Sequence, residues 1–518
     1  MTAELFQAEH AEARDDDGVR RRARVRKALP WSLAAILFTL YAALAVRDQQ
    51  QMVTTGYDLG IFDQAIRSYA HGHLPISTLK GPHYDLLGDH FSPIIATLAP
   101  LYLLWPSAYV LLLGQAALFA VGVVPLTRWA TAELGGRAGL AVGLSYGLSW
   151  GIASAAGFDF HEVAFGVPLL AFSATALGQR RPHAAILWAL PLLLVKEDLG
   201  FTLAAVGVLA ATRGAKRWGI AAAVVGVVGS IVEVKFLIPA ANPTGYAYTT
   251  TLFLAGPAHA GTAVHLLYDA AHLLWPYVKI ITVIQLLAPT AFMAWRSPLI
   301  LLAVPTLAWR FLADDMVYWG TMFQYSAVLM PIVTAAFIEV LIRRRDRLRS
   351  PAPATPPSPS KWSTRFARLT PLSRSTQFTR LTRLWCSSAL PPLVVGLIVT
   401  AVLVPKYPLA KLAHPSTWST SPRIAAAHSL LERIPDGASV SASNTLIPQL
   451  TDRTTVYLFE VDTLSSVTWI VLDTESDNTY PLLTQAGSAQ LVVTAEQDGF
   501  QVVANEDGYL LLHRAGQS

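Results

Sequence analysis

The first apolar stretch of the chain and its basic flank decide the class of fold: residues 20–46 read RRRARVRKALPWSLAAILFTLYAALAV. The apolar part, from about Ala28 to Val46, is uninterrupted and close to the roughly 20 residues that cross a bilayer as a helix. A basic flank before an apolar core also describes a secretory signal, and Ala43-Leu44-Ala45 resembles a cleavage site. Because the apolar run exceeds the roughly 7–15 residues of a signal core, we interpret it as an uncleaved first span.

The composition of the whole chain agrees with a membrane protein. Of its 518 residues, 53% are hydrophobic and only 14% are charged, whereas soluble domains carry about 25% charged residues. This excludes a soluble enzyme, a disordered protein and a coiled coil. The single cysteine, Cys386, excludes an intramolecular disulfide and a cysteine-cluster metal site. In a membrane protein, basic residues usually mark cytoplasmic loops, so we interpret the net charge of +5 in this way and do not expect nucleic acid as a partner.

Ten further apolar segments follow the first one, which predicts about eleven transmembrane helices. They lie at about 107–127, 138–156, 163–178, 183–195, 199–211, 218–238, 277–294, 298–312, 323–342 and 389–405. Several of them are short or are interrupted by Gly and Pro, so a re-entrant segment is an alternative for the shortest. We interpret residues 91–105 as an interfacial stretch.

The distribution of basic residues predicts the topology. With a cytoplasmic N-terminus, the inner segments carry most of the 39 Lys and Arg residues, above all at 14–27 and 343–383. The outer loops between spans carry only Arg47, Arg67, Lys80 and Lys196. This asymmetry follows the positive-inside rule, and an odd number of spans places the region after about residue 406 outside. The expected location is therefore the bacterial plasma membrane, with the N-terminus cytoplasmic and the C-terminal domain extracytoplasmic.

The predicted organisation has five parts. They are a basic cytoplasmic tail (1–27), a transmembrane domain (28–342) with a large first outer loop (47–106), a disordered Pro/Ser/Arg-rich cytoplasmic loop (343–386), a last transmembrane helix (387–405) and an extracytoplasmic α/β domain (406–518).

The α/β assignment of the last part depends on short alternating segments. Ser421-Pro422 predicts a helix start, because proline is favoured at the first helical position. Strands are expected at 439–442, 456–459, 469–473, 491–494, 500–503 and 509–512. Residues 505–508, Asn-Glu-Asp-Gly, predict a hairpin between the last two strands.

The same topology gathers polar residues at the predicted outer face. Charged side chains stand between apolar spans in Phe158-Asp159-Phe160-His161-Glu162 and Val195-Lys196-Glu197-Asp198-Leu199. Ionisable groups near the membrane are costly and usually functional. Solvated loop residues are the plainer alternative, but we expect one shared polar site that includes Asp58, Asp89, His90, Asp159, His161, Glu162, Lys196 and Glu197.

Several of these motifs resemble a bacterial family of polytopic membrane proteins of unknown function. The matching strings are Tyr57-Asp58-Leu59-Gly60-Ile61-Phe62-Asp63-Gln64, Gly88-Asp89-His90-Phe91-Ser92-Pro93, 158–162, Lys196-Glu197-Asp198-Leu199-Gly200, Phe323-Gln324-Tyr325, 440–444, Asp452-Arg453 and 471–473. That family is distantly similar to the GT-C glycosyltransferases, such as protein mannosyltransferases and the lipid A aminoarabinose transferase. The resemblance implies a GT-C-like helical membrane protein, a membrane-lipid environment and a polyprenyl-phosphate-linked sugar as donor.

The resemblance also implies roles for residues. Asp58 would be the general base that deprotonates the acceptor, although Asp58 as the N-cap of a helix through Tyr69 is equally compatible with the residues alone. GT-C enzymes carry an acidic pair after the first span, whereas this chain has Asp58-Leu59 there, which argues against a metal-dependent variant. The expected substrate-binding residues are Asp63, Gln64, Asp89, His90, Asp159, His161, Glu162, Lys196, Glu197, Asp198, Arg310, Gln324 and Tyr325.

The cation that would hold a donor phosphate stays open from the sequence. Lys196, Lys279 and Arg310 could each do so, but Lys196 is as well explained by an ion pair with Glu197 or Asp198.

A divalent metal is a candidate cofactor. The set Asp89, His90, Asp159, His161 and Glu162 has the ligand types that suit zinc or manganese.

Two alternative functions are a transporter and a non-catalytic membrane protein whose α/β domain binds a partner. Against a transporter, the polar residues cluster outside the midplane of the membrane and no internal repeat is evident.

Overall fold

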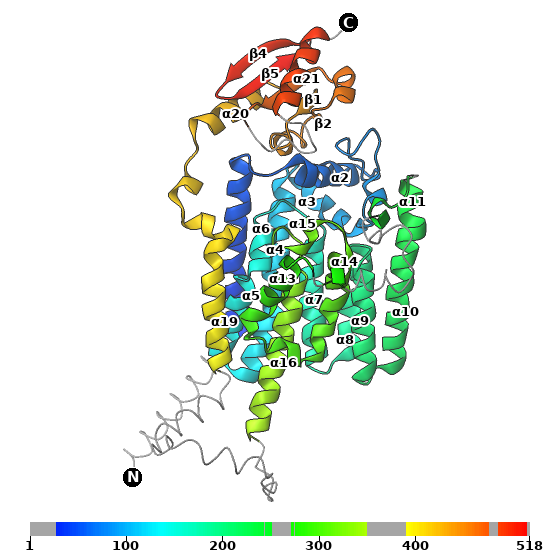
Figure 1. The fold of residues 1–518 in the computed structure, drawn as a ribbon, viewed down its shortest axis with the longest axis vertical. Coiled ribbons are helices and arrows are strands. Elements are labelled where there is room, and N and C mark those ends of the chain that lie inside the picture. Colours follow the sequence, from blue (N-terminus) through cyan, green and yellow to red (C-terminus); the bar gives the residue numbers. More distant parts are fainter. Residues whose placement is uncertain are drawn as a thin grey trace, which may run out of the picture.

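The computed structural model describes residues 27–242, 244–250, 271–273, 275–349, 390–475 and 485–514. Helices stand side by side in one thick layer, and a small domain with a β-sheet lies over one end of that layer (Figure 1). The predicted basic tail falls almost entirely outside the described residues, and so does the predicted disordered loop from residue 350 onward. Residues 343–349 of that loop were assigned wrongly, because they continue a helix to Arg349.

Every apolar segment predicted to span the membrane contains helix. Among the described residues, three helices are long and apolar enough to cross a bilayer on length and composition: Lys27–Gln50, Tyr109–Leu134 and Lys216–Ala241. The others are shorter, so the number of spans stays a prediction. The helices of the layer after the first, Lys27–Gln50, are α4 (Tyr109–Leu134), α5 (Gly136–Gly147), α6 (Trp150–Ala156), α7 (Val163–Gly178), α8 (Pro182–Ala189), α9 (Leu199–Thr212), α10 (Lys216–Val232), α11 (Ile238–Ala241), α13 (Val278–Leu287), α14 (Val304–Leu312), α16 (Leu329–Arg349) and α19 (Leu390–Leu403).

Three predicted spans are interrupted for identifiable backbone reasons. The segment 138–156 is broken between α5 and α6, where Ser149 has an extended backbone. The segment 277–294 ends its regular helix early because Ala291 and Phe292 have positive φ, which a helix does not tolerate. In the segment 323–342 the helix α16 begins only at Leu329, and Phe323 has φ of 63°.

The first outer loop forms short helices that lie across one end of the layer. Among them α2 (Ile61–Ala70) buries one face and lies beneath the small domain (Figure 1). The predicted interfacial stretch is a 3-10 turn (Pro93–Leu98) followed by α3 (Ala99–Leu104). Leu101, Leu103 and Leu104 are more than half exposed, as expected for a helix that rests in a lipid interface.

The C-terminal domain is an α/β unit. Its helix α20 (Pro422–Glu432) begins as predicted, and the Ser421 side chain accepts a hydrogen bond from the Ile424 amide. The strands are β1 (Ser439–Ala442), β2 (Thr455–Leu458), β3 (Trp469–Asp473), β4 (Gln501–Glu506) and β5 (Tyr509–His513), in the order β2-β1-β3-β5-β4. β1 is parallel to both β2 and β3, β5 is antiparallel to β3, and β4 is antiparallel to β5.

One strand prediction in this domain was wrong. Residues 491–494 lie in the helix α21 (Gln485–Gln497), not in a strand. Leu491 and Ala495, four residues apart, are both buried against Phe500 and β5, which is the spacing of one helix face. The hairpin was predicted correctly, and Asp507 and Gly508 at its turn both have positive φ, as a tight hairpin turn requires.

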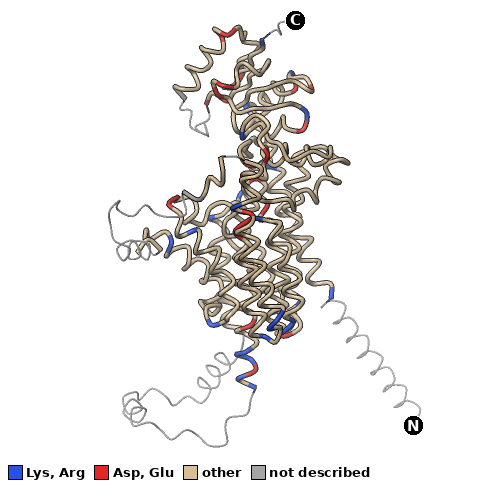
Figure 2. Tube along the Cα trace, turned by 90° about the vertical axis from the view of Figure 1, so that its right-hand side faces the viewer, with Lys and Arg blue, Asp and Glu red and all other residues tan. Residues whose placement is uncertain are grey.

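The two ends of the helical layer differ in charge. The basic end of α16 extends from the end that is far from the C-terminal domain (Figure 1). Lys and Arg collect at that far end, whereas acidic and basic residues mix beneath the C-terminal domain (Figure 2). The mixed cluster is the candidate functional site.

Candidate functional site

Asp58 lies in a tight turn between the first helix and α2. The turn, Gly56–Gly60, is a single π-helical turn that leads directly into α2. The Asp58 side chain is 34% exposed, and its Oδ1 lies 3.2 Å from Nε2 of the buried His161. Asp58 is therefore a carboxylate that solvent or a substrate can reach while one side of it is held by the protein.

The alternative role of Asp58 as a helix cap is not seen. The helical turn begins at Gly56, before Asp58, and no side chain caps either this turn or α2. An N-cap side chain has to accept a hydrogen bond from an amide in the first helical turn, whereas the Asp58 carboxylate contacts the His161 ring.

The loop between α6 and α7 brings His161 and Asp159 to this turn. Asp159 is 6% exposed, and its carboxylate accepts hydrogen bonds from the Thr55 amide (3.1 Å) and the Thr55 hydroxyl (2.6 Å). Gln115 of α4 fixes the loop, because its Nε2 donates to the Asp159 carbonyl and its Oε1 accepts from the His161 amide. Asp159 has φ of 28°, a conformation that Asp adopts more readily than most residues.

Two carboxylates are thus close together here. Burial raises the pKa of Asp159 above its ordinary value, and the neighbouring charge of Asp58 raises it further. The environments of the two differ, since Asp58 is accessible and Asp159 is enclosed. Such separation is how paired carboxyl groups take different roles.

Lys196 and Glu162 form an ion pair deeper in the cluster. The Lys196 ammonium lies 2.8 Å from Glu162 Oε1, and the two side chains are 13% and 2% exposed. Burial opposes ionisation of both groups, but their mutual attraction prevails: the pKa of Glu162 is lowered and that of Lys196 is raised. Both therefore carry their charges at neutral pH.

Glu197 joins this pair to His90. Its Oε1 lies 2.7 Å from His90 Nδ1 and accepts a hydrogen bond from the Tyr246 hydroxyl, also at 2.7 Å. Its other oxygen accepts from the Phe91 amide at 3.2 Å. Burial would raise the pKa of Glu197, yet His90 and Lys196 outweigh it and hold that pKa at about 2.

Asp89 is bound on the outer side of the same group. Lys80 lies 3.0 Å from Asp89 Oδ2, and the Tyr248 hydroxyl donates to Oδ1 at 3.3 Å. The Tyr248 ring stacks on His90 with centroids 4.6 Å apart. Residues 244–250 thereby contact both acidic residues of this side.

The two groups are one electrostatic cluster rather than separate pairs. Burial would raise the pKa of Glu162, but the charges of Lys196, His90 and His161 together lower it, so charged groups from both sides act on this carboxylate. Phe323 contacts Phe158, with ring centroids 4.6 Å apart, which brings the 323–325 motif to the loop of His161.

A comparison with known families and structures gives this arrangement a context. A family described as "Predicted membrane protein (DUF2079)" matches residues 49–511. The chain belongs to this family. No curated protein matches it in sequence.

Solved structures resemble the chain in fold. ArnT from Cupriavidus metallidurans bound to undecaprenyl phosphate has a TM-score of 0.52 and 13% identity over 95% of this chain and 98% of that chain. The apo ArnT structure gives 0.50 and 14%, over 95% and 99%. AglB from Archaeoglobus fulgidus, in complex with an inhibitory peptide and a dolichol-phosphate, gives 0.40 and 11%, over 95% and 75%. The DUF2079 chain thus resembles ArnT in fold, and at these identities the likeness concerns the fold alone.

Two predicted binding residues belong to a different contact. Asp63 is completely buried in α2 and accepts a hydrogen bond from the Tyr102 hydroxyl at 3.3 Å. Gln64 donates to the Thr78 hydroxyl and to the Val456 carbonyl of β2. Both residues face the junction between α2 and its neighbours, not the Asp58–His161 pair.

The other predicted cations are engaged by backbone oxygens. Arg310 is fully buried and donates to the carbonyls of Tyr318 and Gly320 at 2.8 Å. Lys279 donates to the carbonyls of His272 and Phe311. The Arg310 contacts hold the loop before α16, and the Lys279 contacts join α13 to the end of α14. Lys196 is the predicted cation that lies within the acidic cluster.

Asp198 and Gln324 complete the predicted set. Burial raises the pKa of Asp198 to about 7, which leaves its carboxyl readily protonated. Within the described ranges, Gln324 Oε1 and His161 Nδ1 are buried and have no hydrogen-bond partner. Buried polar atoms usually have partners, so these two atoms are exceptions to the usual pairing.

The candidate metal ligands are not arranged around a common point. In the part of the chain that the structure describes, no group of three or more His, Cys, Asp or Glu residues could hold a metal ion. Each candidate is instead engaged elsewhere: Asp89 with Lys80, His90 with Glu197, Asp159 with Thr55, His161 with Asp58, and Glu162 with Lys196. The donor set therefore does not fit a divalent metal.

Five residues that contact the predicted site residues were not predicted from the sequence. Thr55, Gln115, Lys80, Tyr246 and Tyr248 all make direct contacts with predicted site residues. Lys80 was noted only as a basic residue of an outer loop. Gln115 carries the one available signal, because a buried amide inside an apolar helix has to find polar partners.

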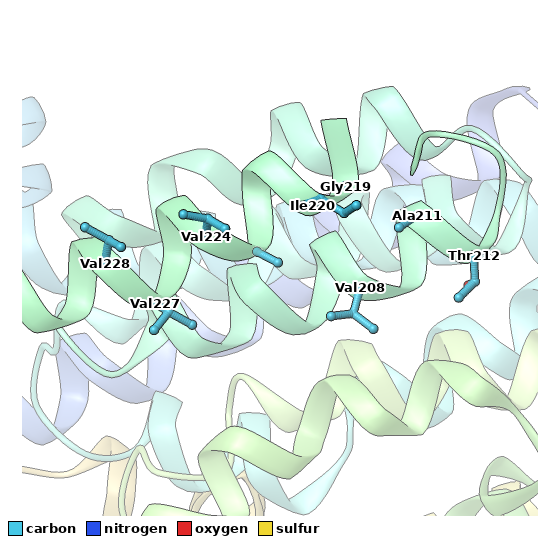
Figure 3. Close-up of a pocket in the computed structure, with 9 residues that line it drawn as sticks. Val208, Ala211, Thr212, Gly219, Ile220, Val224, Val227 and Val228 are labelled. Carbon is cyan, nitrogen blue, oxygen red and sulfur yellow. The ribbon is translucent and has the colours of Figure 1, made fainter. Parts of the chain in front are cut away.

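A groove of about 620 Å³ lies elsewhere, between α9 and α10 (Figure 3). Its lining is apolar and includes Val208, Ile220, Val224 and Val227. None of the residues of the polar cluster lines it. It is therefore separate from the candidate site.

Proposed function

We propose that this protein is a GT-C-like glycosyltransferase that moves a sugar from a polyprenyl-phosphate donor to an acceptor outside the cytoplasm, with Asp58 as general base. The observation that carries the proposal is the accessible Asp58 carboxylate held by His161 at 3.2 Å within a cluster that also contains the buried cation Lys196. The fold that the chain shares with ArnT, which was solved with undecaprenyl phosphate bound, supports the lipid donor.

The proposed reaction needs a base and an electrophilic sugar carbon. An acceptor hydroxyl or amine attacks C1 of the sugar, and its proton passes to the Asp58 carboxylate. The bond between C1 and the phosphate oxygen breaks, and its electron pair stays on the phosphate. The products are the glycosylated acceptor and the polyprenyl phosphate.

The geometry supports this division of roles. With its proton on Nε2, His161 donates to Asp58 and fixes the direction of the carboxylate, while the enclosed Asp159 holds Thr55 at the start of the same turn. The leaving phosphate needs a cation, and Lys196 is our candidate. Its charge is already balanced by Glu162 and Glu197, so a phosphate would bind beside an ordered ion pair rather than a free lysine.

The proposal includes the predicted side of the membrane. The polar cluster and the C-terminal domain are taken to lie outside the cytoplasm. The collection of Lys and Arg at the opposite end of the layer (Figure 2) supports this orientation.

The test is transfer by the purified full chain in lipid nanodiscs. Donors are undecaprenyl-phosphate-linked pentoses and hexoses, and the readout is release of undecaprenyl phosphate with a covalent product. The substitution Asp58→Asn preserves shape and removes proton acceptance, so we expect a rate loss of about 10²–10⁴-fold.

The matched control is Asp498→Asn, which changes an exposed aspartate of the C-terminal domain and should leave the rate unchanged. An Asp58→Asn rate close to that of the wild type would reject Asp58 as the base. Movement of a solute across the bilayer without any covalent product would replace the transferase by a transporter.

A further inference from the structure

The turn that carries Asp58 is held by the C-terminal domain, almost 400 residues later in the chain. The Gly56 amide donates to the Asn444 carbonyl at 2.7 Å, and the Tyr57 amide donates to Asn444 Oδ1 at 2.9 Å. Asn444 is 5% exposed. One asparagine thus binds two successive amides directly before Asp58.

Two glycines of the turn allow this approach. A Cβ atom at Gly56 would lie 2.5 Å from Ile447 Cβ, and one at Gly60 would lie 2.9 Å from Ile447 Cγ2. Both distances are far below van der Waals contact, so a side chain at either position would push the turn and the domain apart. The glycines therefore have a positional role, although neither has a positive φ.

The place of Asn444 in the sheet is informative. It follows β1, whose parallel neighbours β2 and β3 lie on opposite sides. In open α/β sheets, ligands bind at the carboxyl ends of the strands where the chain order reverses. Here that position is occupied by the protein's own Gly56–Gly60 turn.

Other contacts tie the same two regions together. Gln49 donates to the Pro448 carbonyl, and Gln449 donates back to the Gln49 carbonyl. Arg67 of α2 donates to the carbonyls of Thr451 and Thr454. The junction is therefore ordered on both sides of Asp58.

We infer that the C-terminal domain is an integral part of the Asp58 site, and that Asn444 is the positioning residue that sets the Asp58 carboxylate opposite His161. The effect of Asn444 on transfer rests on the proposed function. The contact of Asn444 with the Gly56 and Tyr57 amides does not, so the contact and its effect on transfer can be tested separately.

The first experiment measures geometry without any donor. Hydrogen exchange of the Gly56 and Tyr57 amides is recorded by mass spectrometry on the full chain in nanodiscs. In Asn444→Ala the peptide with these amides should exchange at least about tenfold faster. The Tyr57 amide loses its acceptor Oδ1, and the backbone carbonyl that accepts from the Gly56 amide is then held less firmly. Asn505→Ala, at an exposed asparagine of β4, is the matched control and should not change it. Unchanged exchange in Asn444→Ala overturns the inference.

The second experiment measures transfer. Asn444→Ala should lower kcat about 10–100-fold with little change in KM for the donor, because a misplaced base costs rate rather than lipid binding. Gly56→Ala should do the same, whereas Gly136→Ala, where an added Cβ meets nothing within 4 Å, should be neutral. An unchanged kcat in both Asn444→Ala and Gly56→Ala overturns the positioning role.

Asn444→Asp separates positioning from folding. It keeps an acceptor oxygen for the Tyr57 amide but adds a negative charge near Asp58. A nearby negative charge raises the pKa of a carboxyl group, so the acid limb of the kcat–pH profile should move upward by about half a pH unit or more. A profile identical to that of the wild type overturns the inference even if Asn444→Ala fails to fold.

The proposed function and this inference can fail separately. If Asp58→Asn keeps full transfer while Asn444→Ala changes the exchange, the proposed base is wrong, but the contact between the Asp58 turn and the C-terminal domain stands.

Discussion

The two halves of the polar cluster differ in access. On the Asp58 side, a third of the carboxylate is exposed and its neighbour His161 keeps one ring nitrogen without a partner among the described residues. On the Lys196 side, Lys196, Glu162, Glu197 and His90 are joined in short ion pairs with little exposure. The first half holds the carboxylate that we propose as the general base. The second is a fixed set of charges, which suits orientation and charge balance rather than proton transfer.

The largest expected effect concerns the side of the membrane on which both halves lie. A reporter enzyme that is active only in the cytoplasm, fused after Ser518, should be silent. The reason is that the basic end of α16 lies opposite the C-terminal domain (Figure 1) and basic segments stay inside. The same reporter inserted at residue 350 should be active and serves as the control. Activity at Ser518 would place the whole cluster in the cytoplasm.

The next effect is a difference in stability between variants in the two halves of the cluster. Glu162→Gln removes one partner of a buried ion pair and should lower the free energy of unfolding by about 3 kcal/mol, because a buried charge that loses its partner is costly. Asp58→Asn should change that free energy by less than about 1 kcal/mol, since the side chain is partly exposed. Unfolding in mixed micelles measures both.

Equal stability losses in those two variants would contradict the comparison. If only Asp58→Asn lowers the free energy of unfolding, the accessible half of the cluster contributes more to stability than the Lys196 half.

The smallest expected effect is a pH dependence at the junction of α2. Burial raises the pKa of Asp63 to about 7, so between pH 4 and pH 7 the native state binds more protons there than the unfolded state. Stability therefore falls as the pH rises through this window. Asp63→Asn removes this contribution, so its stability relative to the wild type should increase as the pH rises from 4 to 8, with no gain at pH 4. Parallel curves for the two proteins across this range would show that Asp63 does not titrate.

Local patterns determined much of the fold. The apolar segments, the helix start at Ser421-Pro422 and the hairpin turn at Asp507-Gly508 depend on neighbours in sequence, so the sequence alone predicted them. The exception has a tertiary cause. Residues 492–494 have β-branched side chains, which favour a strand, but Leu491 and Ala495 bury one helix face, and tertiary burial outweighs intrinsic propensity.

The candidate site was predicted as a set of residues but not as an arrangement. Charges at the ends of apolar segments had to lie near one another, because a bilayer leaves polar groups few places. The partners could not be predicted, since Lys196 had Glu197 and Asp198 beside it in sequence yet pairs with Glu162. The metal hypothesis failed for the same reason: among the described residues, each of the five candidate ligands contacts a different partner instead of a common point.

What the sequence determined by itself is the apolar and basic patterning, and with it a polytopic helical protein that carries a small α/β domain. What only the tertiary structure decided is the contact between residues that lie far apart along the chain. Asn444 and Gly56 meet across nearly 400 residues, and Asp58 and His161 across about 100. Hydrogen bonds and ion pairs act over a few ångströms, so their partners are chosen by how the helices and the C-terminal domain pack, and no local pattern of residues records that choice.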